Sequence, residues 1–429
     1  MAQRHTTRWV RAVLAAAVAV LSVATGLGGA TAPAGAAGSG PLTGAVQVAA
    51  GATMSCAVLQ DGTARCWGTG PLGTGGAFNQ TSTLAVVVED DQGDPLTGVE
   101  QIAVGGSHVC ARLADATAVC WGENLAGELG DGTTDPSVVP VAVQQPGGAV
   151  LTGVTELALG DLHSCARMDT GEARCWGQNQ GTLGDGTRKN RTRAVLVRNG
   201  SGTGPLGGVA QVVAGAQHTC ALLTAGTVRC FGENGQGQLG DGTTTARLRP
   251  KLVKPPSGTG PLTNVTQLAA DLQSTCARLA NGQARCWGPN ASGQRGNGTV
   301  TPPFQAGPLR PTAVKAPTGT NLTGVRHVGV AALHACVGVT SGQARCWGLN
   351  TNGQVGDGTR TSPRRFPQVV RDPANAGALP GVEALVGGDQ HTCALLEDTS
   401  VACWGANALG QVGNGATARR KVPTPVQLA

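Results

Sequence analysis

Fourteen cysteines in this chain form seven pairs, and the two members of every pair stand ten residues apart. Six of the seven second cysteines precede Trp-Gly, and the remaining one precedes Phe231-Gly232. Successive first cysteines are 54 to 60 residues apart, so one sequence unit is copied seven times. Self-similarity at such a period predicts a repeat architecture. The pairs are Cys56/Cys66, Cys110/Cys120, Cys165/Cys175, Cys220/Cys230, Cys276/Cys286, Cys336/Cys346 and Cys393/Cys403.

The N-terminal segment has the layout of a secretory signal peptide. Three arginines, Arg4, Arg8 and Arg11, precede an apolar run at residues 12–23, and the small residues Ala34-Gly35-Ala36 suit a cleavage site. We expect residues 1–36 to be removed, which lowers the formal net charge from +6 to +3, and residues 37–429 to form the mature chain. No other stretch approaches the ~20 apolar residues of a transmembrane helix. The sequence predicts a secreted or cell-surface protein without a membrane span, with an uncleaved N-terminal anchor as the alternative.

An exported chain with an even number of cysteines at fixed spacing is typical of a disulfide framework. In the first copy, a three-residue hairpin loop at 60–62 would set Cys56 directly opposite Cys66, and Gly62 suits the left-handed third loop position. Ala116 and Thr399 replace this glycine in two copies, so we expect their hairpins to turn differently. Zinc is the alternative, but Cys-x-x-Cys knuckles are absent. We predict one disulfide per copy and neither a metal nor a cofactor.

The copies have the pattern of an all-β protein. In the fourth copy, apolar β-type runs occupy residues 209–214, 218–223, 228–231 and 250–254, separated by Gly, Asn, Asp and Thr. Four short strands in a period near 55 residues favour a propeller blade over a leucine-rich or helical solenoid. We therefore predict a seven-bladed β-propeller of four-stranded blades, with one disulfide-closed hairpin per blade. A C-terminal strand near residues 422–428 would help tie the last blade to the first.

The residues from Cys120 to Thr133, CWGENLAGELGDGT, resemble the signature of the regulator of chromosome condensation repeat family. Related stretches follow the later cysteine pairs, and only the first copy departs, with Trp67-Gly-Thr-Gly and a shortened loop. The resemblance covers essentially everything after residue 40 and implies a seven-bladed propeller.

The resemblance also implies functions. Guanine-nucleotide exchange on a small GTPase is the activity of the name-giving members, but these are cytoplasmic or nuclear and are expected to carry an inserted wedge for which the even spacing leaves no room. The chain also resembles secreted β-lactamase-inhibitory propellers, which suggests inhibition of a secreted enzyme. Inhibitory surfaces usually rely on aromatic anchors, and this chain has no tyrosine.

A histidine stands two residues before the first cysteine in five copies, and Met54 and Ser274 replace it in the other two. A ring of metal-binding imidazoles is one interpretation. A buried imidazole that hydrogen-bonds neighbouring backbone is the simpler one, because it would recur at the same offset. These residues are His108, His163, His218, His334 and His391.

Asp-Gly or Asn-Gly pairs recur after the Trp-Gly motif and invite a calcium interpretation. Such pairs favour tight turns, and no alternating acidic loop of calcium-binding type surrounds them. The acidic run at residues 89–94 is likewise most simply a solvated loop, with a cation site as the minority interpretation. The pairs begin at Asp131, Asp185, Asp241, Asn297, Asp357 and Asn414.

Positive charge collects just after these turns in four copies and is missing there from copies one, two and five. Solubilising charge is the simpler explanation. The functional alternative is attraction to a protein or an anionic cell-surface polymer, because clustered arginine contacts phosphate or carboxylate in paired fashion. The candidate residues are Arg188, Lys189, Arg191, Arg193, Arg247, Arg249, Lys251, Lys254, Arg360, Arg364, Arg365, Arg419, Arg420 and Lys421.

No nucleophile elbow, phosphate-binding glycine loop or His-Glu metal motif is present in the sequence. A mature charge near +3 disfavours nucleic acid as the partner. The sequence therefore predicts a non-catalytic, monomeric binding scaffold that is exported, with nucleotide exchange and enzyme inhibition as the alternatives.

Overall fold

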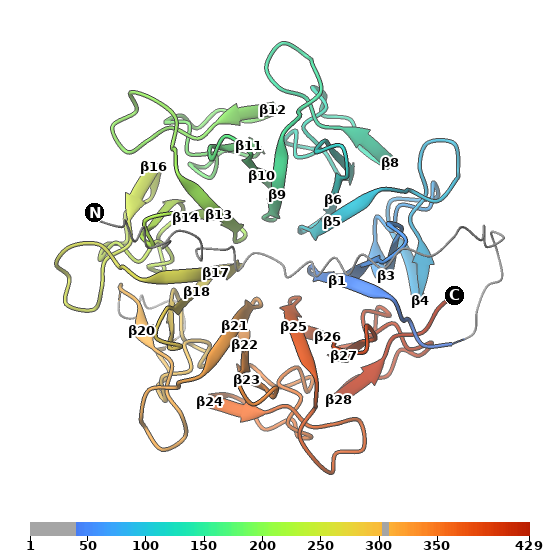
Figure 1. Ribbon diagram of the computed structural model, residues 1–429, viewed down its shortest axis with the longest axis vertical. Coiled ribbons are helices and arrows are strands. Elements are labelled where there is room, and N and C mark those ends of the chain that lie inside the picture. The colour runs from blue at the N-terminus through green and yellow to red at the C-terminus, as the bar shows by residue number, and fades with distance from the viewer. Residues whose placement is uncertain (1–39, 303–308) are drawn as a thin grey trace, which may run out of the picture.

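The computed structural model describes residues 40–302 and 309–429. It contains seven antiparallel sheets of four strands each, and the strands of each sheet are consecutive in sequence (Figure 1). The sheets are blades arranged around a central axis, so the predicted all-β, seven-bladed propeller is confirmed. The predicted signal peptide at 1–36 lies outside the described residues. The described residues contain no helix with the length and apolar character that a membrane crossing requires.

The strand bounds repeat closely from blade to blade. Blades 1 and 2 contain β1 Ala45–Ala50, β2 Met54–Leu59, β3 Ala64–Gly70, β4 Gln80–Val87, β5 Val99–Val104, β6 His108–Leu113, β7 Ala118–Gly122 and β8 Ser137–Ala142. Blades 3 and 4 contain β9 Val154–Leu159, β10 His163–Met168, β11 Ala173–Gly177, β12 Arg191–Leu196, β13 Val209–Ala214, β14 His218–Leu223, β15 Val228–Gly232 and β16 Arg247–Leu252. Blade 5 contains β17 Val265–Asp271, β18 Ser274–Leu279, β19 Ala284–Trp287 and β20 Thr312–Ala313. Blades 6 and 7 contain β21 Val325–Val330, β22 His334–Val339, β23 Ala344–Gly348, β24 Arg364–Val369, β25 Val382–Gly387, β26 His391–Leu396, β27 Val401–Gly405 and β28 Arg420–Pro425.

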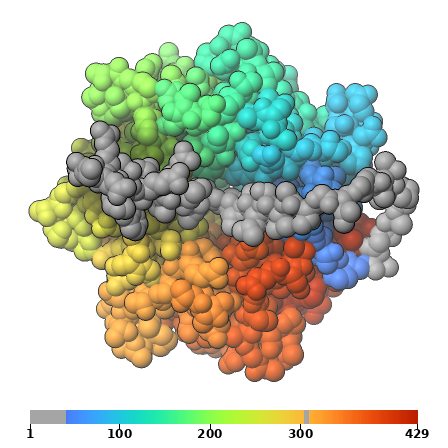
Figure 2. Space-filling view, viewed as in Figure 1, coloured from blue at the N-terminus to red at the C-terminus, as the bar shows by residue number. Residues whose placement is uncertain are grey.

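The first strand of each blade lies next to the central axis and the fourth lies at the perimeter (Figure 1). Because neighbouring strands are antiparallel, the loops between the third and fourth strands leave one face of the disc, which we name the long-loop face. The second-to-third-strand hairpins and the connections between blades leave the other face, which we name the hairpin face. Figure 2 shows the blades as lobes that meet along radial junctions.

The hydrophobic core is divided among these junctions. The cluster between blades 1 and 2 joins Cys56 and Val58 of blade 1 to Ile102 and Trp121 of blade 2, all almost fully buried. Corresponding clusters fill the other junctions. Each blade is thus covered only by its two neighbours, which explains why a closed ring is needed to bury every apolar face.

The chain ends close the ring. The amide of Leu42 donates to Val426 O at 2.8 Å, and the amide of Leu428 donates to Gly40 O at 2.8 Å. Val426 is buried in one cluster with Leu42 and Trp67 of the first blade. The expectation that the C-terminal segment ties the last blade to the first is confirmed.

One expectation about the hairpins is wrong. Ala116 and Thr399 have φ angles of 62° and 66°, in the same left-handed region as Gly62 at 77°. Their amides donate to Leu113 O and Leu396 O, as Gly62 donates to Leu59 O. The cysteines flanking each hairpin are paired in register and bonded in all blades, so the disulfide-closed frame holds these two residues in a conformation that normally favours glycine.

Candidate functional site

The seven predicted disulfides are present, one in each blade. Each pair of cysteines is directly opposed between the second and third strands, with Cα atoms 4.0–4.1 Å apart. The sulfurs are buried and face the next blade, as Cys110 and Cys120 do in the cluster that contains Trp176 of blade 3. The disulfides therefore fix hairpin register inside the blades and form part of the packing surface between them. The same arrangement is found for the other six pairs, which are formed by Cys56 and Cys66, Cys165 and Cys175, Cys220 and Cys230, Cys276 and Cys286, Cys336 and Cys346, and Cys393 and Cys403.

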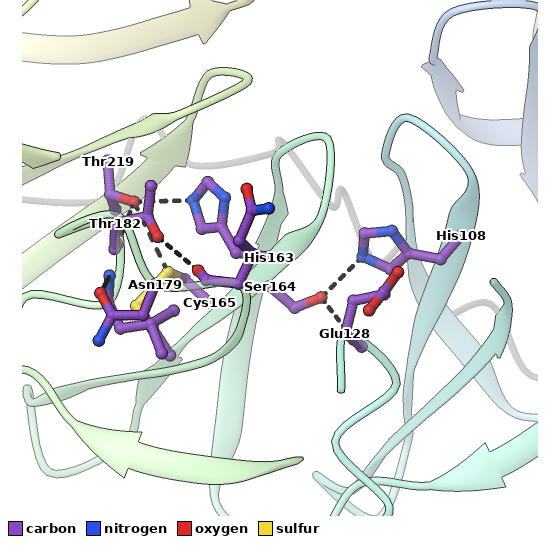
Figure 3. The surroundings of a disulfide bond; sticks show 11 residues. His108, Glu128, His163, Ser164, Cys165, Asn179, Thr182 and Thr219 are labelled. Atoms are coloured by element: carbon purple, nitrogen blue, oxygen red, sulfur yellow. Dashed lines mark hydrogen bonds between the residues drawn. A yellow bond between two sulfur atoms is a disulfide. The ribbon is translucent and has the colours of Figure 1, made fainter. Parts of the chain in front are cut away.

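The repeated histidines connect neighbouring blades. His108 Nε2 lies 2.8 Å from Ser164 Oγ of the next blade, and Ser164 Oγ donates to Glu128 O at 2.9 Å (Figure 3). Because the serine hydrogen is used in the second bond, His108 Nε2 must donate the first. The Trp176 indole also donates to Glu128 O, at 2.8 Å. The same imidazole-to-hydroxyl bridge joins His163 to Thr219, His218 to Thr275, His334 to Thr392 and His391 to Ser55.

The structural interpretation of the histidines is confirmed, with one correction: the partner is a side-chain hydroxyl of the next blade and not neighbouring backbone. Burial lowers the pKa of His108 to about 3 and that of His218 to about 4. The rings are therefore neutral at physiological pH. In the described part of the chain, no three His, Cys, Asp or Glu side chains are grouped so that they could hold a metal ion.

The two copies without histidine also lack the partner hydroxyl. Met54 of blade 1 faces a blade whose corresponding residue is Val109, and Ser274 of blade 5 faces one whose corresponding residue is Ala335. Both members of the bridge are thus replaced together across a junction, so that no imidazole is buried there without its hydroxyl partner.

In blades 2 to 7, the long loop is held by a buried asparagine that follows the Trp-Gly or Phe-Gly motif. In blade 4, Asn234 Oδ1 accepts from the amide of Leu239 at 3.0 Å, and its Nδ2 donates to Thr243 O at 3.0 Å. Asp241 Oδ1 accepts from the Thr243 amide at 2.9 Å, which closes the Asp-Gly turn. The turn interpretation of the Asp-Gly pairs is confirmed.

Several of the predicted basic residues pair with these same aspartates. Arg191 contacts Asp185 at 2.7 Å, Arg247 contacts Asp241 at 2.7 Å, and Arg364 contacts Asp357 at 2.5 Å. Arg420 meets the side-chain amide of Asn414 at 2.9–3.0 Å. These four arginines brace their own loops, and the charges of Arg191, Arg247 and Arg364 are compensated by aspartates within the protein.

The ion pairs also set the ionisation of the aspartates. Burial alone would raise the pKa of Asp185, but hydrogen bonds from Arg191 and Thr187 hold it below its ordinary value. Burial acts in the same way on the pKa of Asp241, and hydrogen bonds from Thr243 and Arg247 again lower it. Both carboxylates therefore stay charged and the braces persist at neutral pH.

The remaining predicted cations do not converge on one patch. Arg193 donates to Gln144 Oε1 of blade 2 at 3.0 Å, and Lys254 is half-buried. The exposed set lies around the perimeter of blades 3, 4, 6 and 7, and we name it the basic rim. It consists of Arg188, Lys189, Arg249, Lys251, Arg360, Arg365, Arg419 and Lys421.

Arg310 of blade 5 was not among the basic residues predicted from the sequence to belong to the site. Arg310 packs against Gly242: a Cβ atom added at Gly242 would lie 3.1 Å from Arg310 Nε. Arg249 packs in the same way against Gly186, where an added Cβ atom would lie 2.8 Å from Arg249 Nε. Both arginines therefore lie across a blade junction against a turn glycine. Each also directly precedes a proline, Pro311 or Pro250, and this shared position could have identified Arg310 as a member of the series.

A cavity of about 650 Å³ runs between the innermost strands. Glutamines join these strands across the junctions: Gln47 Nε2 donates to Ile102 O at 3.0 Å, and Gln47 Oε1 accepts from the Ile102 amide at 2.8 Å. Gln101 and Gln211 make the same two bonds to the next blade.

Glu156 takes the glutamine's place in blade 3. Its carboxylate accepts from the Val212 amide at 3.0 Å. Burial raises the pKa of Glu156 to about 7, against the opposing effects of that hydrogen bond and of Arg167. The carboxyl group is therefore partly protonated near neutral pH, and in the protonated form it has the same donor and acceptor pattern as a glutamine amide.

Family models for the regulator of chromosome condensation (RCC1) repeat match residues 45–73, 99–128, 154–181, 209–238 and 382–411, and also 225–277 and 341–395. The chain belongs to the RCC1 repeat family. Each match within the first set starts at the innermost strand of a blade and extends into its long loop. This part carries the cysteines and, outside blade 1, also the histidine and the buried asparagine.

Two curated proteins show this relationship along much of the chain. The ultraviolet-B receptor UVR8 of Arabidopsis thaliana is 27% identical over 332 residues, which cover 76% of this chain and 69% of the receptor. The human E3 ubiquitin-protein ligase HERC2 is 30% identical over 280 residues, which cover 64% of this chain and 5% of the ligase.

Two solved structures share the fold. Prp20p of Saccharomyces cerevisiae superposes with a TM-score of 0.67 at 19% identity, covering 89% of this chain and 86% of that one. Human WBSCR16 superposes with a TM-score of 0.66 at 21% identity, covering 84% and 88%. At these identities the likeness concerns the fold alone.

Proposed function

We propose that the protein is an exported, non-catalytic binding scaffold that attracts a protein or an anionic cell-surface polymer through its basic rim. The observation that carries the proposal is the division of the arginines into two sets. Arg191, Arg247 and Arg364 are neutralised by aspartates of their own loops. The rim cations are exposed and are not members of these pairs.

The long loops support this role because hydrogen bonds hold them in place next to the basic rim. The buried asparagines fix the long loops, so cations such as Arg188 and Arg360 are carried by ordered turns. A preorganised surface loses less entropy on binding than a mobile one. Protein binding by a related propeller is also known: the solved structure of Prp20p was reported with its binding properties to Gsp1p and histones. Seven buried disulfides support an oxidising location, in agreement with the predicted export.

The test is a binding measurement on the mature chain with two matched fourfold variants. One replaces rim residues Arg360, Arg365, Arg419 and Lys421 by serine and leaves the bracing arginines Arg364 and Arg420 in place. The other replaces cations placed by topology on the hairpin face, namely Arg198, Lys315, Arg326 and Arg371. Both variants lose the same charge, so a difference between them reports on location.

Binding partners would be captured from culture medium and wall extracts at ~50 mM and ~200 mM salt. We expect capture by the unmodified chain and by the hairpin-face variant, a strong decrease at the higher salt because exposed charges are screened, and loss of capture by the rim variant. Equal capture by the two variants would refute the rim, and absence of any captured partner would refute the scaffold role.

A further inference from the structure

One junction departs from the repeat at three positions at once. In six blades, a buried aliphatic residue of the long loop packs in the same cluster as the aromatic residue of the next blade: Leu72, Leu129, Leu183, Leu239, Val355 and Val412. Blade 5 has Arg295 at this position, and it is only 1% exposed. The same blade has Ser274 in place of histidine, and blade 6 has Ala335 in place of the partner hydroxyl.

Arg295 is a buried cation without a counter-charge. Its Nε donates to Gly288 O at 2.8 Å and its Nη2 donates to the same oxygen, whereas Nη1 is buried and has no hydrogen-bond partner among the described residues. The ion pairs found among the described residues do not include Arg295. Burial lowers its pKa to about 10, so the group remains protonated at neutral pH. A buried charge without a counter-charge strongly destabilises the folded state, so we expect an anion to bind beside this guanidinium.

Ser274 supplies a second unused donor beside the same glycine. The serine is 3% exposed, and within the described part of the chain its Oγ has no hydrogen-bond partner. The Cβ that Gly288 lacks would stand 3.2 Å from Ser274 Cα, so the serine and the carbonyl that holds the guanidinium belong to adjoining backbone. In the junctions of Figure 3, an imidazole and a hydroxyl satisfy each other at this level. Here serine and alanine leave a donor without an acceptor.

Because both donors are buried, only a small anion would fit beside them. A carboxylate or phosphate brings several oxygens and a bulky remainder, and neither Arg295 nor Ser274 is open to solvent. A monatomic anion is compact and accepts hydrogen bonds from any direction. Gln294 Nε2 is also buried without a partner, but so is Gln354 Nε2 in blade 6, so this amide alone does not distinguish the junction.

We propose that the junction between blades 5 and 6 binds a halide ion, chloride under physiological conditions, at Arg295 Nη1 with the Ser274 hydroxyl as a second donor. The ion replaces, at this one junction, the neutral bridge that histidine and a hydroxyl make elsewhere. This site is independent of the basic rim and of any partner that the rim binds.

The test compares thermal melting of the mature protein in sodium chloride and in sodium gluconate at equal ionic strength. An ion that binds only the folded state raises the melting temperature saturably, and we expect a rise on the order of 1–3 °C in chloride. Arg295→Leu restores the aliphatic residue of the other blades and should abolish the difference between the salts. Arg371→Leu, at an exposed site, should retain it.

Equal melting temperatures of the unmodified protein in the two salts would overturn the proposal, as would an undiminished chloride effect in Arg295→Leu. If that variant does not fold, crystals of the unmodified protein grown in sodium bromide decide the matter by anomalous scattering. A bromide peak within about 3.5 Å of Arg295 Nη1 supports the site, and the absence of a peak there refutes it.

Discussion

At the scale of single residues, the junctions show that each histidine of the repeated series occurs together with its hydroxyl partner in the next blade. His108 and Ser164 form a bridge at 2.8 Å, and the equivalent residues between blades 1 and 2 are both apolar, Met54 and Val109. The sequence analysis identified the histidine series but not its partners, because the hydroxyl residue lies a whole repeat away and no local pattern joins the two. The blade-to-blade packing is what brings them together.

This pairing predicts a thermodynamic coupling. Ser164→Val should cost about 1–3 kcal/mol because it leaves His108 Nε2 buried without an acceptor, and His108→Met should cost about 1 kcal/mol for the lost bond. The double variant reproduces the Met54 and Val109 pair and should cost less than the sum of the single changes. Denaturant unfolding of the three variants measures the coupling, and additive costs would contradict the bridge.

Glu156 predicts a dependence of stability on pH. Its pKa is about 7 in the folded protein against an ordinary value of 4.5, so the folded state holds a proton that the unfolded chain releases. Stability is therefore retained below pH 4.5 and falls as pH rises through 7, by up to about 3 kcal/mol.

Glu156→Gln removes this titration and completes the two-bond bridge to blade 4 that Gln47, Gln101 and Gln211 make elsewhere. We expect its advantage in melting temperature over the unmodified protein to grow between pH 5 and pH 8. Glu100→Gln, at an exposed carboxylate, serves as the control and should show no growing advantage. Parallel pH curves for the unmodified protein and Glu156→Gln would contradict the assignment.

At the scale of elements, the bounds of the three inner strands of a blade could be predicted from the sequence, whereas those of the outer strand could not. In blade 4, the expected runs at 209–214, 218–223 and 228–231 match β13, β14 and β15 to within one residue. The expected run at 250–254 corresponds to β16, which spans Arg247–Leu252. The inner strands are largely buried and therefore apolar, whereas β16 is an edge strand that carries the exposed Arg249 and Lys251 and tolerates Pro250.

The candidate site could also be predicted only in part from the sequence. The sequence identified the basic residues but not that Arg191, Arg247 and Arg364 would be neutralised by the aspartates of the preceding turns. These pairs form because the loop folds back around a buried asparagine, and that return depends on tertiary contacts. The arginines available to a partner are consequently fewer than the charge pattern indicated.

The two hairpins without glycine predict different responses to substitution by glycine. Ala116 holds a φ of 62° with no other role for its side chain, so Ala116→Gly should stabilise the protein by about 0.5–1 kcal/mol. Thr399 holds a φ of 66°, but its Oγ1 accepts from the Gly44 amide at 3.0 Å and so helps to close the ring. Thr399→Gly should therefore bring no gain. Denaturant midpoints measure both, and destabilisation by Ala116→Gly would contradict the strain argument.

At the scale of the whole molecule, the ring is held by the repetition of one junction rather than by exchange of a strand between its ends. Each sheet is built from consecutive strands, and β28 belongs wholly to blade 7. The closing junction uses the same devices as the others, since His391 bridges to Ser55 at 2.7 Å and the Trp67 indole donates to Gln411 O at 3.0 Å. Within each blade, a disulfide joins the two central strands, so every junction is formed between two blades that are each cross-linked internally.

We therefore expect the chain to be exported and to close one disulfide within each of its seven blades. The most direct test is mass spectrometry of the protein recovered from culture medium, intact and after proteolysis without reduction. The account predicts a chain beginning near residue 37, a mass lower by fourteen hydrogens than that of the reduced mature chain, and linked peptides only between cysteines ten residues apart. Free thiols, links between different blades, or retention of the full-length chain inside the cell would contradict it.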